Sequence, residues 1–159
     1  MAKYQPNTPQ LLWKAEMMNE GPFKPGKAKG SAKEGLRFQA KVHKALARLK
    51  PAGMLLDSPW FKYYDVNGSH WAQPDSVVVC SDRTIVVESK LSLRRLDIAK
   101  AQLYKLYIPI LWAVFEKPVF PVVAFHHWVR EHADFPTIAE PKEILTMPVR
   151  HQPIGWHLL

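Results

Sequence analysis

Three ionisable residues could do chemistry in this chain because each stands at the end of an apolar run. Asp75 comes just before the run 77–79, and Glu88 and Lys90 close the run 85–87. Charged groups at the ends of buried strands are costly unless something compensates them. Asp75, Glu88 and Lys90 are therefore the leading candidates for a functional site.

The spacing of these residues predicts that they converge. Residues 81–83 form a tight connection, so residue 75 pairs roughly with residue 89 and Asp75 lies beside Glu88. Glu88 and Lys90 are two residues apart on one strand and point to the same face. A divalent cation would relieve the repulsion between the two carboxylates, and oxygen ligands suit Mg²⁺. The alternative is a surface salt bridge of Glu88 with Lys90 or Arg83, in which Asp75 is only a turn residue.

The pattern Pro74-Asp75, twelve residues, then Glu88-Ser89-Lys90 resembles the signature of the PD-(D/E)XK nuclease superfamily. Gly35-Leu-Arg-Phe38-Gln39 resembles the opening of the first helix in archaeal Holliday-junction resolvases and related phage nucleases. Gln102-Leu-Tyr104 is similar to a glutamine element in the second helix of many members. The resemblance covers residues 31–127 and implies a restriction-endonuclease-like αβββαβ core, with a mixed central sheet flanked by helices.

The same resemblance implies a role for each matching residue. Asp75 and Glu88 would hold Mg²⁺ or Mn²⁺ with help from the Ser89 carbonyl. Lys90 would serve the attacking water, and Gln102 would contact the scissile phosphate or brace Lys90. We expect alanine in place of any of the three charged residues to abolish cleavage with little loss of stability.

The first helix departs from the resolvase pattern, which has a glutamate where this chain has Gln39. Either Gln39 lies at the site and binds a metal-bound water, or Glu34 supplies the missing carboxylate from a shifted register. Glu34 is also suited to cap the helix start with Ser31. We favour Gln39 near the site and Glu34 mainly as a cap.

The elements that must position these residues follow from periodicity and turn signals. We expect helices at 31–50 and 93–115, the second kinked or ended by Pro109, and strands at 60–64, 71–80, 84–91 and 119–125. Asn67-Gly68 predicts a turn after the first strand. The order predicts an α/β fold with one mixed sheet. Residues 1–30 form an accessory segment with a short helix at 9–19. Residues 128–159 form a Pro-rich extension of the same domain, with an edge strand near 155–159.

The charge distribution points to a polyanionic partner. The net charge is +8, and residues 24–50 hold nine basic residues and one acid, so nine minus one accounts for the whole excess. The alternative is a solvated basic helix. We expect the basic helix to lie beside the site. The residues expected to contact DNA are Lys33, Arg37, Lys41, Lys44, Arg48, His70 and Trp71.

Composition narrows the class of protein further. The single cysteine, Cys80, excludes an internal disulfide framework and a cysteine-based zinc site. The sequence predicts no signal peptide and no membrane span, which favours the cytoplasm of a bacterium or phage-infected cell. We expect a structure-selective endonuclease for branched or flap DNA, in recombination, repair or phage replication. The alternatives are an exonuclease acting on DNA ends and a non-catalytic nucleic-acid-binding subunit. Junction resolution would require a homodimer, because two strands must be cut.

Overall fold

A central five-stranded sheet organises the chain. The computed structural model describes residues 12–23, 26–48, 53–91, 93–126 and 154–158. The sheet contains β2 (Gly53–Asp57), β5 (Ser76–Cys80), β6 (Thr84–Lys90), β7 (Val119–His126) and β8 (Ile154–Leu158), in that order. Only β6 and β7 run parallel among these neighbours, so the sheet is mixed, as expected.

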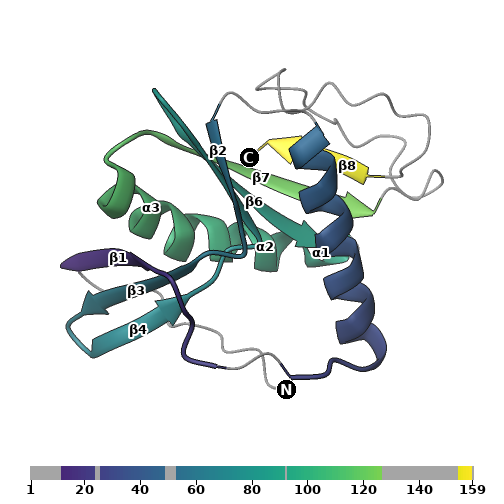
Figure 1. Ribbon diagram of the computed structural model, residues 1–159, viewed down its shortest axis with the longest axis horizontal. Helices are drawn as coiled ribbons and strands as arrows, with labels where there is room; N and C mark the ends of the chain where they lie inside the picture. Colours follow the sequence, from purple (N-terminus) through teal and green to yellow (C-terminus); the bar gives the residue numbers. More distant parts are fainter. Residues whose placement is uncertain (1–11, 24–25, 49–52, 92, 127–153, 159) are drawn as a thin grey trace.

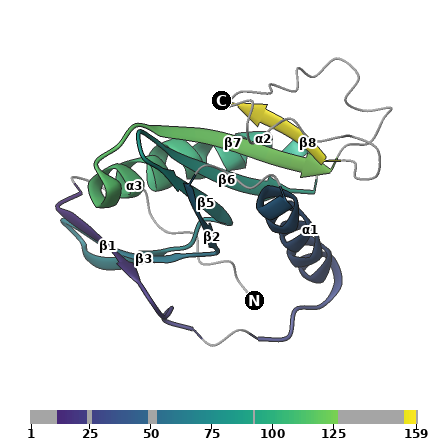
Figure 2. The same cartoon turned by 45° about the horizontal axis from the view of Figure 1, so that its top comes forward.

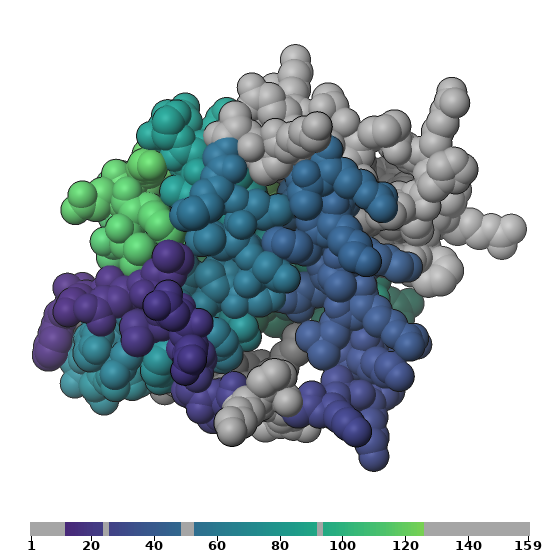
Figure 3. All heavy atoms as spheres, viewed as in Figure 1, coloured from purple at the N-terminus to yellow at the C-terminus, as the bar shows by residue number. Residues whose placement is uncertain are grey.

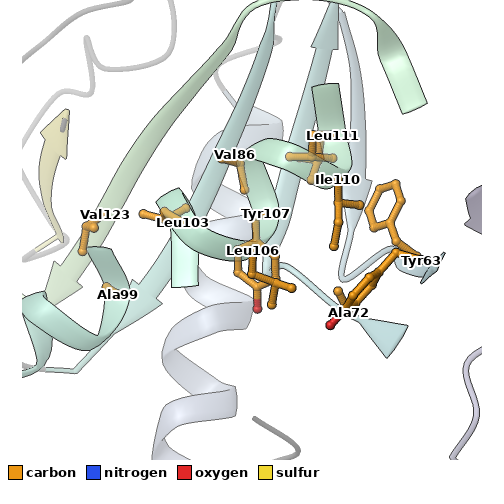
Figure 4. Close-up of a cluster of buried hydrophobic side chains, with 12 residues drawn as sticks. Tyr63, Ala72, Val86, Ala99, Leu103, Leu106, Tyr107, Ile110, Leu111 and Val123 are labelled. Carbon is orange, nitrogen blue, oxygen red and sulfur yellow. The ribbon is translucent and has the colours of Figure 1, made fainter. Parts of the chain in front are cut away.

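Helices cover both faces of this sheet (Figures 1 and 2). On one face α1 (Gly30–Arg48) packs its apolar stripe, including Phe38 and Val42, against Ile85 and Val87 of β6. On the other face a helical run packs against Val77, Val86 and Val123 (Figure 4). Because side chains alternate along a strand, successive β6 residues feed the two clusters in turn. The predicted α/β architecture is thereby confirmed.

The second helical run is continuous but changes its winding. A 3₁₀ turn (Leu93–Arg95) leads into α2 (Leu96–Gln102), then a π-helical segment (Leu103–Tyr107) and α3 (Ile108–Phe115). The Ile108 N–H donates to the Leu103 carbonyl, five residues back. Pro109 cannot donate a backbone hydrogen bond and its ring crowds the preceding turn, which explains why the winding widens here.

A smaller antiparallel sheet stands beside the first. Its order is β1 (Lys14–Met18), β3 (Trp60–Asp65), β4 (Gly68–Ala72). The Asn67-Gly68 turn is confirmed: Asp65 Oδ1 accepts a 2.8 Å hydrogen bond from the Asn67 N–H, and Gly68 adopts a φ of +116°. The inner side of this sheet packs against the α2–α3 run, with Phe61 edge-on to Phe115.

Three expectations about strands and helices are wrong. The helix expected at 9–19 is contradicted by β1, because Lys14–Met18 pairs with β3 over five residues. The strand at 60–64 exists but belongs to the smaller sheet, and the first strand of the central sheet is β2. The strand at 71–80 is two strands, since residues 73–75 leave one sheet before β5 enters the other. Pro74 cannot donate to a ladder and marks the break.

The remaining elements follow the expectations closely. Helix α1 begins at Gly30, one residue before the expected cap Ser31, with Gly30 at a φ of +57°. Strand β7 is the expected buried strand, and β8 pairs antiparallel with β7 as the expected edge strand. None of the helices in the described ranges is long and apolar enough to cross a membrane. Residues 128–153, most of the Pro-rich extension, lie outside the described residues, as do residues 1–11.

Candidate functional site

The β5–β6 hairpin brings the predicted acidic pair together. Ser76 pairs with Val87, so the next position outward places Asp75 across from Glu88. Asp75 Oδ2 accepts a 2.7 Å hydrogen bond from the Ser89 N–H. The register differs by one residue from the expected pairing of 75 with 89, and it places Asp75 and Glu88 at facing positions just beyond the paired part of the ladder.

Lys90 lies between a carboxylate and an amide. Its Nζ donates to Glu88 Oε1 at 2.6 Å and to Gln102 Oε1 at 2.8 Å. Glu88 is 3% exposed and Lys90 is 7% exposed, so this ion pair is buried. Gln102, at the end of α2, therefore braces Lys90, one of the two roles implied for it.

Glu88 also has an oxygen that the protein does not satisfy. Among the described residues, Glu88 Oε2 is buried and has no hydrogen-bond partner. A buried carboxylate oxygen without a partner is costly and calls for a proton, a water or a cation. The same holds for Ser89 Oγ on the next residue, which is also buried and unpartnered in the described part of the chain.

The donor set fits a hard divalent cation, with a low number of protein ligands. Asp75, Glu88 and the Ser89 carbonyl would offer oxygen, the ligand type that Mg²⁺ prefers while it keeps several waters. Over the described ranges, no three His, Cys, Asp or Glu side chains gather closely enough to form a protein-only metal cage. Glu34 is exposed on α1 and contributes no third carboxylate beside Asp75 and Glu88.

A chain of hydrogen bonds fixes the backbone of Asp75. The Ser58 N–H donates to the Asp75 carbonyl at 2.9 Å, and Gln73 Nε2 donates to the Ser58 carbonyl at 2.9 Å. Tyr107 completes the chain by donating its hydroxyl to the Gln73 carbonyl at 3.1 Å. Ser58 adopts a left-handed φ of 46°, which strains a serine and is held by these bonds.

Burial, followed by the neighbouring Glu88 and Asp75 carboxylates, raises the pKa of Tyr107 well above its ordinary value near 10. The phenol therefore stays protonated and remains a donor across the neutral range. The two carboxylates that act on it are the candidate metal ligands, which places Tyr107 beside the site. Nothing in the spacing of the second helix singles out Tyr107 as a site residue.

Gln39 approaches the site indirectly. Its Nε2 donates to Ser58 Oγ at 2.8 Å, and that hydroxyl lies 3.4 Å from the Asp75 carbonyl. One helical turn further on, His43 Nδ1 lies 3.3 Å from Ser76 Oγ. Gln39 thus braces the strand end that carries Asp75 and does not join the carboxylates. Ser58, Gln73 and His43 were missed because their role depends on the break between β4 and β5.

The basic residues of α1 form one exposed row. Lys33, Arg37, Lys41, Lys44 and Arg48 recur every three or four residues, and all are exposed. Relative to Phe38 on the buried stripe, Gln39 lies about 100° to one side and Lys41 about 60° to the other. The row therefore occupies the flank of α1 away from Gln39. The helix itself lies beside the site through Gln39 and His43.

The two remaining DNA-contact candidates differ in their surroundings. His70 Nε2 lies 2.9 Å from the buried carboxylate of Asp65, and its ring stacks on Tyr63 with centroids 5.2 Å apart. Trp71 is half-buried on the opposite, outer face of the smaller sheet. His70 is thus engaged within the fold, while Trp71 is accessible.

No family model matches this chain, and neither the curated proteins nor the solved structures give a significant match. The identification of the site therefore depends on its residues and their geometry. Two carboxylates, a buried ammonium and a glutamine amide converge where β5 begins, β6 ends and α2 ends.

Proposed function

We propose that this protein is a metal-dependent DNA nuclease in which Asp75 and Glu88 bind Mg²⁺ or Mn²⁺. The observation that carries the proposal is the buried Lys90, held by Glu88 and Gln102, beside a Glu88 oxygen that lacks any partner in the described chain. The bound ion would lower the pKa of a water and polarise a phosphodiester. Lys90 would hold its positive charge near developing negative charge on the phosphate.

The order of elements supports a restriction-endonuclease-like core. With the β3–β4 hairpin set aside as an insertion, the chain runs α1, β2, β5, β6, the α2–α3 run and β7. That is one helix, three antiparallel strands, a helical crossover and a parallel strand, the αβββαβ order that the resemblance implies. The exposed basic row of α1 supports a polyanionic substrate. Within this proposal the substrate is branched or flap DNA. Resolution of a four-way junction would need a homodimer, because two strands must be cut.

The second candidate is a nucleic-acid-binding module without catalysis. It is favoured by the direct 2.6 Å contact of Lys90 with Glu88, which would let the pair serve the fold alone. In that case the protein would bind DNA equally well with or without a divalent cation.

A cleavage assay on the purified full chain separates the two candidates. Linear duplex, single-stranded, flap and four-way DNA are incubated with Mg²⁺, Mn²⁺, Ca²⁺ or chelator. We expect cleavage with Mg²⁺ or Mn²⁺ only. Asp75→Asn should abolish it while the amide oxygen still accepts from the Ser89 N–H. Asp82→Asn, an exposed change at the far end of the same hairpin, is the matched control and should cleave normally. Full activity of Asp75→Asn, or full activity in chelator, would rule the proposal out.

A further inference from the structure

The outer face of the smaller sheet carries a row of aromatic and basic side chains. Burial alternates along β3, so that Phe61, Tyr63 and Asp65 are buried while the residues between them reach the surface. The outer positions are Trp60, Lys62 and Tyr64 on β3, with Trp71 across from Lys62 on β4 and Lys14 across from Tyr64 on β1. The backbone of Gly21 packs on the Trp60 indole, since a Cβ atom at Gly21 would lie 2.2 Å from that ring. We therefore call the set Lys62, Tyr64 and Trp71 the platform.

The platform places a cation among aromatic rings. Lys62 Nζ lies 5.5 Å from the Tyr64 ring centroid and 5.7 Å from that of Trp71. The Trp60 and Trp71 rings are nearly perpendicular, with centroids 6.1 Å apart. Glu16 also reaches this face, but Lys14 binds it at 2.7 Å. Lys62 lies directly across from Glu16 on β1 and has no ion-pair partner among the described residues.

We propose that the platform binds an unpaired strand of DNA, by stacking of bases on its rings and contact of Lys62 with the phosphate backbone. Every base offers a flat face to an aromatic ring, and a lysine supplies the electrostatic attraction that a purely apolar partner would not use. Positions two apart on a strand advance about 6.6 Å, which is the spacing of Lys62 and Tyr64 along β3.

The platform lies close to the candidate site along the chain. Trp71 is four residues before Asp75, and Trp60 is two residues after Ser58, whose N–H binds the Asp75 carbonyl. Figures 1 and 3 show the smaller sheet as a lobe set apart from α1, so the platform and the basic row are separate surfaces. This inference rests on the proposed nuclease function and narrows its substrate to DNA with an unpaired strand beside the cleaved bond.

Binding measured in chelator tests the platform apart from catalysis. The full chain is titrated into fluorescein-labelled oligothymidine and into a duplex of equal length, with anisotropy as the readout. We expect Trp71→Ala to weaken oligothymidine binding about 5- to 150-fold, the range for loss of one base stack, and to leave duplex binding unchanged. Trp71→Phe should restore most of the affinity, and Lys62→Gln should reduce the salt dependence. Trp112→Ala removes an exposed tryptophan on α3, outside the platform, and should bind like the unaltered protein.

Equal affinity of Trp71→Ala and the unaltered protein for oligothymidine would overturn the platform, as would an equal loss for both DNAs. Circular dichroism of each variant establishes that it is folded, and Lys62→Gln tests the same surface without removing an aromatic ring. The two proposals fail separately. Metal-dependent cleavage with no effect of Trp71 removes the platform alone. Trp71-dependent strand binding without cleavage removes the nuclease function and leaves the platform as a binding surface.

Discussion

Lys90 contacts one oxygen from a strand and one from a helix, and this changes the expected effect of its substitution on stability. Its ammonium is the buried link between Glu88 on β6 and Gln102 at the end of α2. From the sequence alone these charges belong to a polar site whose loss costs little stability. Glu88 is only 3% exposed and Lys90 only 7%, which contradicts that expectation. Removing one partner would leave the charge of the other buried and uncompensated.

We therefore expect Lys90→Met to lower the free energy of unfolding by roughly 3–5 kcal/mol, since Glu88 is left buried and uncompensated. Urea unfolding measures the loss. The double variant Glu88→Leu/Lys90→Met should recover most of it, because no buried charge remains. If Lys90→Met were as stable as the unaltered protein, the pair would have to be solvated in solution.

Gln39 contacts Ser58 and not the carboxylates, so a glutamate there should not strengthen metal binding. Gln39→Glu replaces the amide donor to Ser58 Oγ by a carboxylate, close to Asp57, which that hydroxyl also contacts at 3.1 Å. We expect about 1 kcal/mol of lost stability and no gain in cleavage at low Mg²⁺. Glu34→Gln, an exposed change on the same helix, is the control and should shift stability by no more than about 0.5 kcal/mol. Higher turnover of Gln39→Glu would show that this side chain reaches the metal.

At the scale of elements, the helical run over β6 provides both Gln102 and Tyr107. Gln102 directly precedes the π-helical segment and Tyr107 is its last residue. Pro109 favours this segment by removing a backbone donor from the next turn. The apolar spacing predicts this helix and the proline predicts a disturbance. The hydroxyl of Tyr107 could not be assigned from spacing, since its partner Gln73 lies in the break between two sheets.

Tyr107 gives a pH dependence with a defined sign. Its folded pKa is raised above the unfolded value near 10, so the stabilisation is complete below pH 10 and is lost as the pH rises toward the folded pKa. Above pH 10 this residue should contribute a decline of up to about 1.4 kcal/mol per pH unit. Tyr107→Phe should lack that component in a comparison of unfolding free energies at several alkaline pH values. Parallel curves for the two proteins would contradict the burial of the phenol beside Glu88 and Asp75.

The basic row of α1 is exposed on the flank of the helix away from Gln39. Because contacts with phosphates do not depend on the base sequence, this row should raise the affinity for DNA without selecting a sequence. Changing Lys41, Lys44 and Arg48 together to Gln should reduce the log–log salt slope of duplex binding by about 2–3 if all three contact phosphates. The control changes Lys100 and Lys105 to Gln, two exposed lysines of the α2–α3 run on the other side of the sheet. An unchanged slope in the triple variant would mean that DNA does not contact this flank.

At the scale of the whole molecule, the candidate site lies where β5 begins and β6 ends, and the β3–β4 hairpin of the smaller sheet is inserted between β2 and β5 of the central sheet. The sequence predicts the mixed α/β fold, the β5–β6 hairpin and β7, because long apolar runs and a three-residue connection determine them. It does not reveal β2, whose five residues follow the end of a helix, or the assignment of β3 to another sheet. Long-range pairing, which spacing along the chain does not encode, decides both.

A bound cation should stabilise the whole fold, because the site joins two strands and a helix. Any ligand that binds only the folded state adds stability, about 2.7 kcal/mol at a concentration one hundred times its dissociation constant. We expect Mg²⁺ to raise the thermal midpoint of the unaltered protein and of Asp82→Asn, but not that of Asp75→Asn. This readout does not depend on cleavage. A midpoint in Asp75→Asn that rises equally with Mg²⁺ would place the cation elsewhere.

The hydrogen bond from the Ser89 N–H to Asp75 Oδ2 has a spectroscopic consequence. That amide proton points at a side-chain carboxylate at the end of the β5–β6 ladder, so its resonance should be sensitive to what the carboxylate binds. In a ¹H–¹⁵N spectrum the Ser89 cross-peak is then a built-in indicator of the state of Asp75. Titration of Mg²⁺ or of an oligonucleotide would move this peak if each reaches the acidic pair, while amides at the Asp82 turn would serve as an internal reference.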